Sequence, residues 1–152
     1  LKQSTGEFSE RIADSSLALE LQLTDGPLMI MADGRLLWRV FENLLSNICK
    51  YSQPGTRVYV TTRVENGCVV TDFKNISRER LSIPGKDLTE RFVRGDSSRS
   101  TDGSGLGLSI AKSFTELQGG TFDIITDGDL FKAEIRFPVA VQKNERERNE
   151  EQ

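Results

Sequence analysis

Four polar residues recur at helical spacing within an otherwise apolar stretch of the sequence. They are Asn43, Asn47, Lys50 and Tyr51. Steps of four, seven and eight residues from the first member return to nearly the same side of an α-helix, so the four fall within an arc of roughly 100°. Asn47 lies at the border of the apolar face, where an amide without a partner costs about 1–3 kcal/mol. Two interpretations stay open from the helix alone: a stripe that binds a polar ligand, or ordinary edge residues with Asn47 bonded to a buried carbonyl.

A glycine-rich segment follows about 55 positions later, where a polar loop meets an apolar helical pattern. It reads Gly103-Ser104-Gly105-Leu106-Gly107-Leu108. Free backbone amides and the helix dipole at such a junction favour a phosphate, and glycines without β-carbons allow close approach. The segment is neither a Walker loop, because GxxxxGK[ST] is missing, nor a Rossmann turn, because no strand directly precedes it. Taken alone, it fits a flexible linker or a simple helix start equally well.

Composition narrows the chemistry that is available. The chain of 152 residues contains no histidine, which excludes Ser-His-Asp triads, histidine bases and histidine metal ligands within it. Cys49 and Cys68 are well separated and have no CxxC partner, which indicates reduced core residues of a cytosolic protein rather than a zinc site. A net charge of -3 predicts no nucleic-acid partner. The apolar runs are shorter than the roughly 20 residues that a membrane helix needs.

Apolar periodicity and turn residues predict the elements that position these side chains. The clearest is a helix over residues 34–51, capped by Asp33 and ended by Gln53-Pro54-Gly55. We also expect a helix over 7–16 and one over 106–117, strands over 18–23 and 28–31, and hairpins over 57–64 with 68–73 and over 121–126 with 130–137. Such an order predicts an α+β, two-layer α/β sandwich with about three helices on one face of a mixed, mostly antiparallel sheet.

Three segments in this order resemble the boxes of sensor histidine kinases in the GHKL ATPase superfamily. RVFENLLSNICKYS (39–52) is similar to the asparagine box, LTERFVRGD (88–96) to the phenylalanine box, and GSGLGLSIAKSF (103–114) to the second glycine box. The resemblance covers about residues 7–138 and implies the Bergerat fold. It also implies an N-terminal helical segment over 1–16, an ATP-binding catalytic domain over 17–138 with a lid at about 80–104, and a charged, disordered tail over 139–152.

The resemblance assigns roles within the asparagine box. Asn47 matches the family's magnesium-binding asparagine, and Asn43 matches the catalytic polar residue one turn earlier. Lys50 matches a lysine that contacts phosphate, and Tyr51 matches an aromatic residue beside the adenine. A single neutral amide oxygen suffices for magnesium, which keeps waters and phosphate oxygens as its other ligands.

The resemblance also assigns roles in the lid and in the second glycine box. Arg94 follows the phenylalanine box and matches an arginine that reaches the γ-phosphate, where a delocalised positive charge suits phosphoryl transfer. Its alternative role is a solvated charge paired with Asp96. The glycine box contributes nucleotide-binding positions through Gly103, Ser104, Gly105, Leu106, Gly107 and Leu108.

The first glycine box departs from the family pattern. The family usually has DxGxG after a strand, with the aspartate accepting a hydrogen bond from the adenine amino group. Here the register puts Asn75 in place of the aspartate and Ser77 in place of the first glycine. An amide oxygen can still accept from adenine, so we expect weakened rather than abolished binding. Asp72 is an alternative match by residue type, three positions out of register.

The function implied is ATP binding with Mg²⁺ and transfer of the γ-phosphoryl group to a histidine on a dimerisation domain outside this chain. A response regulator is the implied next acceptor, and the implied full-length protein is a membrane-anchored homodimer with this domain in the cytoplasm of a bacterium. Two alternatives stay open: a degenerate nucleotide-binding module without kinase activity, which the altered glycine box favours, and a serine kinase of the anti-sigma type.

Overall fold

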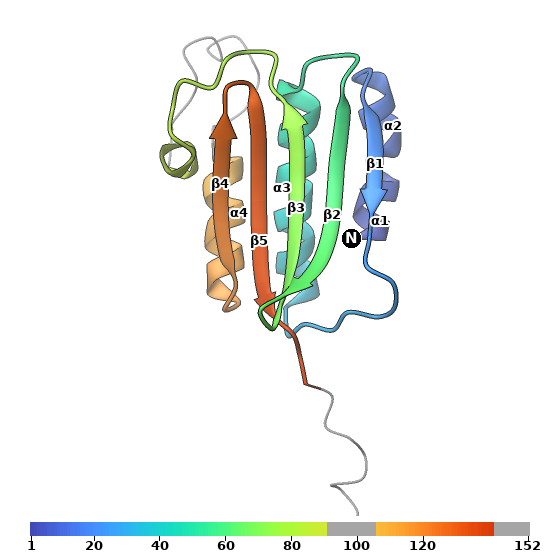
Figure 1. The fold of residues 1–152 in the computed structure, drawn as a ribbon, viewed down its shortest axis with the longest axis vertical. Helices are drawn as coiled ribbons and strands as arrows, with labels where there is room; N and C mark the ends of the chain where they lie inside the picture. Colours follow the sequence, from blue (N-terminus) through green and yellow to red (C-terminus); the bar gives the residue numbers. More distant parts are fainter. Residues whose placement is uncertain (91–105, 142–152) are drawn as a thin grey trace, which may run out of the picture.

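The computed structural model describes residues 1–90 and 106–141. The predicted lid beyond residue 90 and the predicted tail beyond residue 141 lie outside these ranges. Five strands form one sheet in the order β1-β2-β3-β5-β4, with β1 parallel to β2 and every other pair antiparallel. The elements, in chain order, are α1 (Lys2–Glu7), α2 (Ser9–Asp14), β1 (Ala18–Gln22), α3 (Gly34–Tyr51), β2 (Arg57–Glu65), β3 (Cys68–Ile76), the 3-10 helix η1 (Gly85–Thr89), α4 (Gly107–Leu117), β4 (Thr121–Asp127) and β5 (Leu130–Pro138), as Figure 1 shows.

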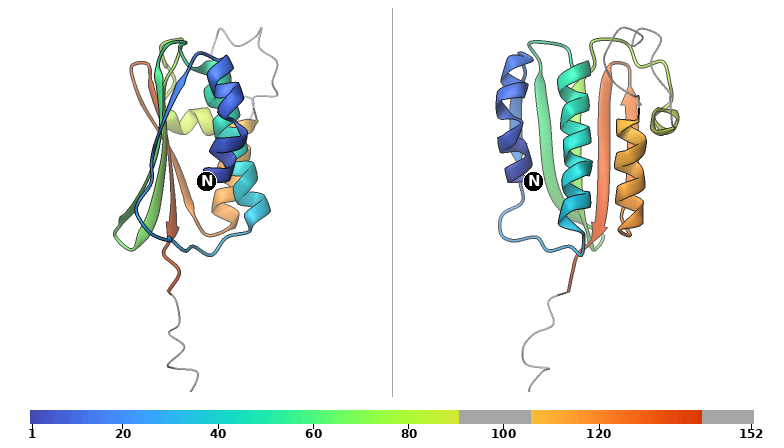
Figure 2. Two further views of the ribbon diagram at one scale, coloured as in Figure 1. Left: turned by 90° about the vertical axis from the view of Figure 1, so that its right-hand side faces the viewer. Right: turned by 180° about the vertical axis from the view of Figure 1, so that it is seen from behind.

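The α-helices form one layer against one face of this sheet (Figure 2). The contact between the layers is apolar: the Phe41 ring of α3 lies 5.8 Å from the Phe73 ring of β3, centroid to centroid. The apolar stripe of α3 is buried at Val40, Phe41, Leu44, Leu45 and Ile48. The two-layer α+β sandwich predicted from the sequence is therefore confirmed.

The opposite face of the sheet is charged instead of covered by helices. Because side chains alternate along a strand and Phe73 faces α3, Asp72 points to this outer face, directly beside Glu134 of β5. Two neighbouring carboxylates repel each other. Arg63 and Lys132 pair with both carboxylates, and the Arg136 Nη2 atom lies 2.7 Å from Glu134 Oε1. These ion pairs neutralise the centre of the face.

Two predicted elements differ in the structure. The first helix starts at Lys2 rather than at residue 7, and it is interrupted at Phe8. The early start is not visible in the apolar pattern, because the residues buried there, Ser4 and Thr5, are polar. The strand expected over 28–31 is reduced to one bridge, between Ile30 and Val139, so most of that segment joins no ladder. Both ends of the helix predicted over 34–51 are confirmed, and the other boundaries differ by at most three residues, the largest difference being the continuation of β3 to Ile76.

Close packing also fixes the segment that follows β3. A Cβ atom added at Gly85 would lie 2.7 Å from the carbonyl carbon of Ile124, so η1 begins directly against the backbone of β4. Any larger side chain at Gly85 requires the two backbones to separate. Among the described residues, no helix combines the length and the apolar character that a bilayer crossing requires.

Glu134 on the outer face makes the folding stability of the domain depend on pH in the acid range. Burial raises the pKa of this carboxyl, but hydrogen bonds from Lys132 and Arg136 outweigh burial and leave the pKa below its usual value. A lowered pKa in the folded state contributes stability that is present above the unfolded pKa of about 4.5 and is lost as the pH falls through the folded value.

We expect Glu134→Gln to lower the free energy of unfolding at pH 7 by about 1–2 kcal/mol, with the difference from wild type shrinking below about pH 4.5. Urea denaturation across this pH range measures it. Glu116→Gln, which changes an exposed carboxylate on α4, is the control and should track wild type. A difference that stays constant with pH would show that the Glu134 charge contributes nothing to the folded state.

Candidate functional site

The polar stripe of α3 is oriented by how the helix begins and what it buries. Asp33 Oδ1 accepts hydrogen bonds from the backbone N–H groups of Arg35 at 2.8 Å and Leu36 at 3.1 Å, which caps the helix as predicted. With the apolar stripe turned to the sheet, Asn43 and Asn47 are half-buried beside the core. Near the helix end, Tyr51 is half-buried and Lys50 is exposed.

The start of α4 lies against the middle of α3. A Cβ atom added at Gly107 would lie 3.6 Å from the Oδ1 atom of Asn43, so the first turn of α4 and this amide face each other. Leu106 is the N-terminal flanking residue of α4, and among residues 1–90 and 106–141 no side chain caps the backbone N–H groups that follow it. Of the predicted glycine box, Gly107 is therefore placed against Asn43, and Leu106 and Leu108 flank it at the start of α4. Arg94, Gly103, Ser104 and Gly105 lie outside the described residues.

The C-terminal end of α3 is joined to the C-terminal end of β3. Ser52 forms a bridge with Ser77, and the backbone N–H of Gln53 donates to the carbonyl of Ile76 at 2.7 Å. The backbone N–H of Arg78 donates to the carbonyl of Tyr51 at 2.8 Å, and its guanidinium donates to the carbonyl of Lys50. These bonds hold the residues after β3 in a fixed place beside Lys50 and Tyr51.

The buried side chain of Asn75 lies at this junction of α3 and β3. It lies two residues after Phe73, so its side chain is on the helix-covered face of the sheet, where it is only 3% exposed. Its Nδ2 group donates to Ser52 Oγ at 2.8 Å, whereas its Oδ1 atom is buried and has no hydrogen-bond partner among the described residues. Asp72, the alternative match from the sequence, faces the other side of the sheet and is paired with Arg63.

Two buried amide atoms, one on α3 and one on β3, therefore lack a hydrogen-bond partner among the described residues. Within the described ranges, the Nδ2 atom of Asn43 is also buried without a partner. Asn43 precedes Ser52, the partner of Asn75, by nine positions on α3, which corresponds to about 13 Å along the helix axis. A ligand that offers a hydrogen-bond acceptor to Asn43 and a donor to Asn75 satisfies both atoms. The third such atom, Asp72 Oδ1, lies on the outer face among charged side chains.

Sequence reasoning missed Ser52. The residue follows Tyr51 directly, but its partner Asn75 is 23 positions away, and no local pattern reports a contact over that separation.

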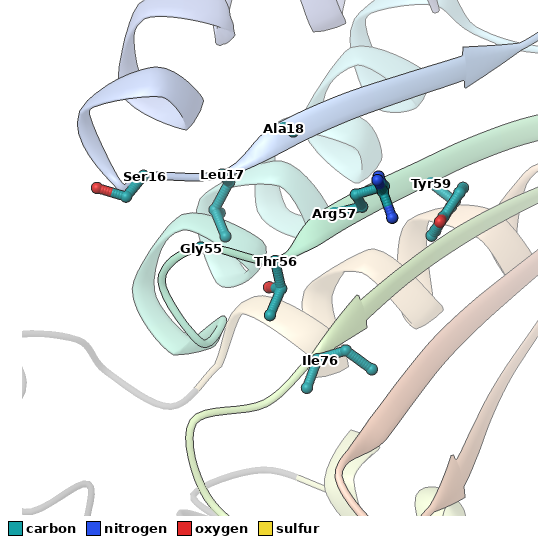
Figure 3. A pocket seen from close by; sticks show the side chains of 8 residues that line it. All are labelled: Ser16, Leu17, Ala18, Gly55, Thr56, Arg57, Tyr59 and Ile76. Carbon is teal, nitrogen blue, oxygen red and sulfur yellow. The ribbon is translucent and has the colours of Figure 1, made fainter.

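An open hollow of about 710 Å³, lined among others by Ser16, Gly55, Arg57 and Tyr59, is shown in Figure 3. Lys74 lies two residues after Asp72 on β3 and therefore faces the same outer side, and Tyr59 is its partner on β2. The hollow thus opens on the outer side of the sheet and is not part of the candidate site.

The two-layer sandwich, with Asn43 of α3 against the start of α4, is consistent with a nucleotide-binding ATPase domain. The chain belongs to the family described as Histidine kinase-, DNA gyrase B-, and HSP90-like ATPase, which residues 32–145 match. The family assignment confirms the resemblance drawn from the three sequence boxes.

Individual relatives narrow the family to sensor kinases. The sensor histidine kinase HprS of Escherichia coli is 34% identical over 111 residues, which are 68% of this chain and 23% of the relative. The probable sensor protein PcoS of Escherichia coli is 37% identical over 98 residues, 63% of this chain and 21% of the relative. The solved structure of the mycobacterial sensor histidine kinase MprB, 26% identical, superimposes with a TM-score of 0.76 and covers 93% of this chain and 97% of that one. The chain spans about a fifth to a quarter of these two curated relatives, and it has the fold and sequence of their ATP-binding catalytic domain.

The buried amide of Asn43 should cost stability when no ligand is bound. We expect Asn43→Ala to raise the free energy of unfolding of the ligand-free protein by about 1 kcal/mol, because the substitution removes an unpaired buried N–H group. Ser46→Ala, on the same helix, controls for the higher helix propensity of alanine. Thermal and urea denaturation without nucleotide measure both variants. A smaller gain for Asn43→Ala than for Ser46→Ala would show that the amide is paired in the free protein.

Proposed function

We propose that this chain binds Mg-ATP in the region between α3 and α4 and delivers the γ-phosphoryl group to a histidine outside the chain. The observation that carries the proposal is the pair of buried, unpaired amide atoms of Asn43 and Asn75 within the described residues. Each costs free energy in the empty protein and gains a partner when a ligand with the matching group binds. A nucleotide has such groups at two separate places, its base and its phosphates.

The Asn75 end suits the base. The Oδ1 atom of Asn75 is an acceptor, and the amino group of adenine is a donor, so the two complement each other. Tyr51 is half-buried at the adjoining end of α3 and offers an aromatic face for the purine. Both assignments follow the roles that the family resemblance gives these positions.

The Asn43 end suits the phosphates. The Asn43 side chain lies by the start of α4, where the backbone N–H groups of the first turn and the helix dipole favour an anion. Gly107 leaves room for close approach there, and by the family resemblance Gly103 and Gly105 would do the same, while Lys50 and Arg94 would supply positive charge. Arg94, Gly103 and Gly105 are assigned from the resemblance alone.

Magnesium fits this site as a companion of the nucleotide. No group of three or more histidine, cysteine, aspartate or glutamate residues that could hold a metal ion occurs in the part of the chain that the structure describes. A dedicated acidic cage is also unnecessary, because Mg²⁺ is bound largely by waters and phosphate oxygens. Asn47 would contribute one amide oxygen from α3. The ion would supply neutralisation of the charge that develops on the phosphates.

The acceptor of the phosphoryl group is proposed to be a histidine of a dimerisation domain, because this chain contains no histidine and its relatives are sensor histidine kinases. A response regulator would then receive the group, and the whole protein would be a membrane-anchored homodimer. The residues of this chain hold the nucleotide and direct its terminal phosphate, which is the larger part of catalysis in phosphoryl transfer.

Calorimetric titration with ADP, with magnesium and with magnesium chelated, tests the proposal through Asn47. We expect Asn47→Ala to weaken ADP binding about tenfold or more when magnesium is present and to change it little when magnesium is absent. Ser46→Ala is the control, because it changes the neighbouring residue on the same helix. An equal loss under both conditions would make Asn47 a structural amide, and no binding by the wild-type protein would overturn the proposed function.

Replacing the Asn75 amide by a carboxylate tests the base end. A carboxylate accepts from the adenine amino group in a stronger, charge-assisted bond and repels the carbonyl that guanine has at the same position. We therefore expect Asn75→Asp to tighten ATP binding by about 1 kcal/mol, about fivefold, and to weaken GTP binding. Dissociation constants of both nucleotides for both proteins give the answer. If the ATP-to-GTP ratio does not change, Asn75 does not contact the base.

A further inference from the structure

We infer that Ser52 is a specificity-determining positioning residue, whose hydroxyl holds the Asn75 amide with its oxygen toward the bound base. The inference rests on the proposed function, since it concerns the base end of that site. It adds a residue to which neither the sequence pattern nor the family resemblance gives a role.

The orientation of the Asn75 amide decides what the site can recognise. An amide has an acceptor at one end and two N–H donors at the other, and the two ends have nearly the same shape. With the oxygen outward, Asn75 accepts from a purine that has an amino group at position six. With the nitrogen outward, it donates to a purine that has a carbonyl there. Asn75 alone therefore distinguishes these bases poorly.

Ser52 removes this ambiguity in the structure. Its hydroxyl oxygen accepts a hydrogen bond of 2.8 Å from Asn75 Nδ2, and both residues are at least nine-tenths buried, Ser52 at 4% exposure and Asn75 at 3%. If the amide were reversed, the hydroxyl could donate to the oxygen, but both N–H groups would then lack a partner among the described residues. Buried N–H groups without a partner are rarer in proteins than carbonyl oxygens without one, so the observed orientation is the less costly of the two.

The position of Ser52 is itself fixed by the backbone. The bridge to Ser77 and the bond from the Ser52 N–H group to the Ile48 carbonyl, 3.1 Å, hold it at the end of α3. The backbone therefore keeps the hydroxyl oxygen within hydrogen-bond distance of the Asn75 amide. Ser52, at the junction of α3 with β3, therefore favours the orientation of Asn75 that accepts from a 6-amino purine. Without Ser52, Asn75 could bind a 6-amino or a 6-carbonyl purine.

ADP and inosine diphosphate test the inference, because they differ only in the purine six-substituent and the adjacent ring proton. We expect wild type to prefer ADP and Ser52→Ala to reduce the ratio of the two affinities about three- to tenfold, as the amide becomes free to turn. Ser52→Thr keeps the hydroxyl and should keep the ratio. In the Asn75→Asp protein both side-chain oxygens are acceptors, so there Ser52→Ala should change the ratio less than about twofold.

An unchanged ratio in Ser52→Ala, or the same change in the Asn75→Asp protein, would overturn the role of Ser52. Should Ser52→Ala fail to fold, Ser52→Cys replaces it, because a thiol is a weak donor and acceptor. A smaller fall of the ratio is then expected, and no fall overturns the inference. If wild type binds neither nucleotide, the proposed function fails instead, which separates the two results.

Discussion

The site depends on the joint between the end of α3 and the end of β3. The helix carries Asn43 and Asn47, and the strand carries Asn75, so neither element alone makes a site. Backbone hydrogen bonds at Gln53 and Arg78 fasten the two elements together where the side chains meet. Backbone bonds of this kind do not depend on side-chain identity, which allows the polar residues around the joint to be chosen for binding rather than for stability.

The two faces of the sheet illustrate two ways of stabilising one layer. On the inner face, helices exclude water, and the polar atoms left over inside, those of Asn43 and Asn75, become available for a ligand. On the outer face, ion pairs around Asp72 and Glu134 replace a second helix layer. Strand alternation sends residues 72 and 75 to opposite faces, so two polar residues three positions apart have unrelated roles.

Local patterns predicted the elements better than they predicted the site. The bounds of α3 follow from its apolar period and the Asp33 cap, and both hairpins follow from turn residues next to alternating strands. Contacts between distant residues could not be predicted, because the Ser52 bond to Asn75 and the approach of Gly85 to Ile124 have no local signal. Small buried polar residues such as Ser4 concealed the start of the first helix, since periodicity counts apolar side chains.

The pairing of β1 has a consequence for how the domain can be shortened. The family match begins at residue 32, beyond β1, whereas β1 is the strand that pairs with the outer edge of β2. A chain trimmed to the match would expose the backbone edge of β2 from Arg57 to Thr61, which β1 now covers. Such an edge recruits strands from other molecules. β1 therefore shields this edge of β2 from pairing with a strand of another molecule.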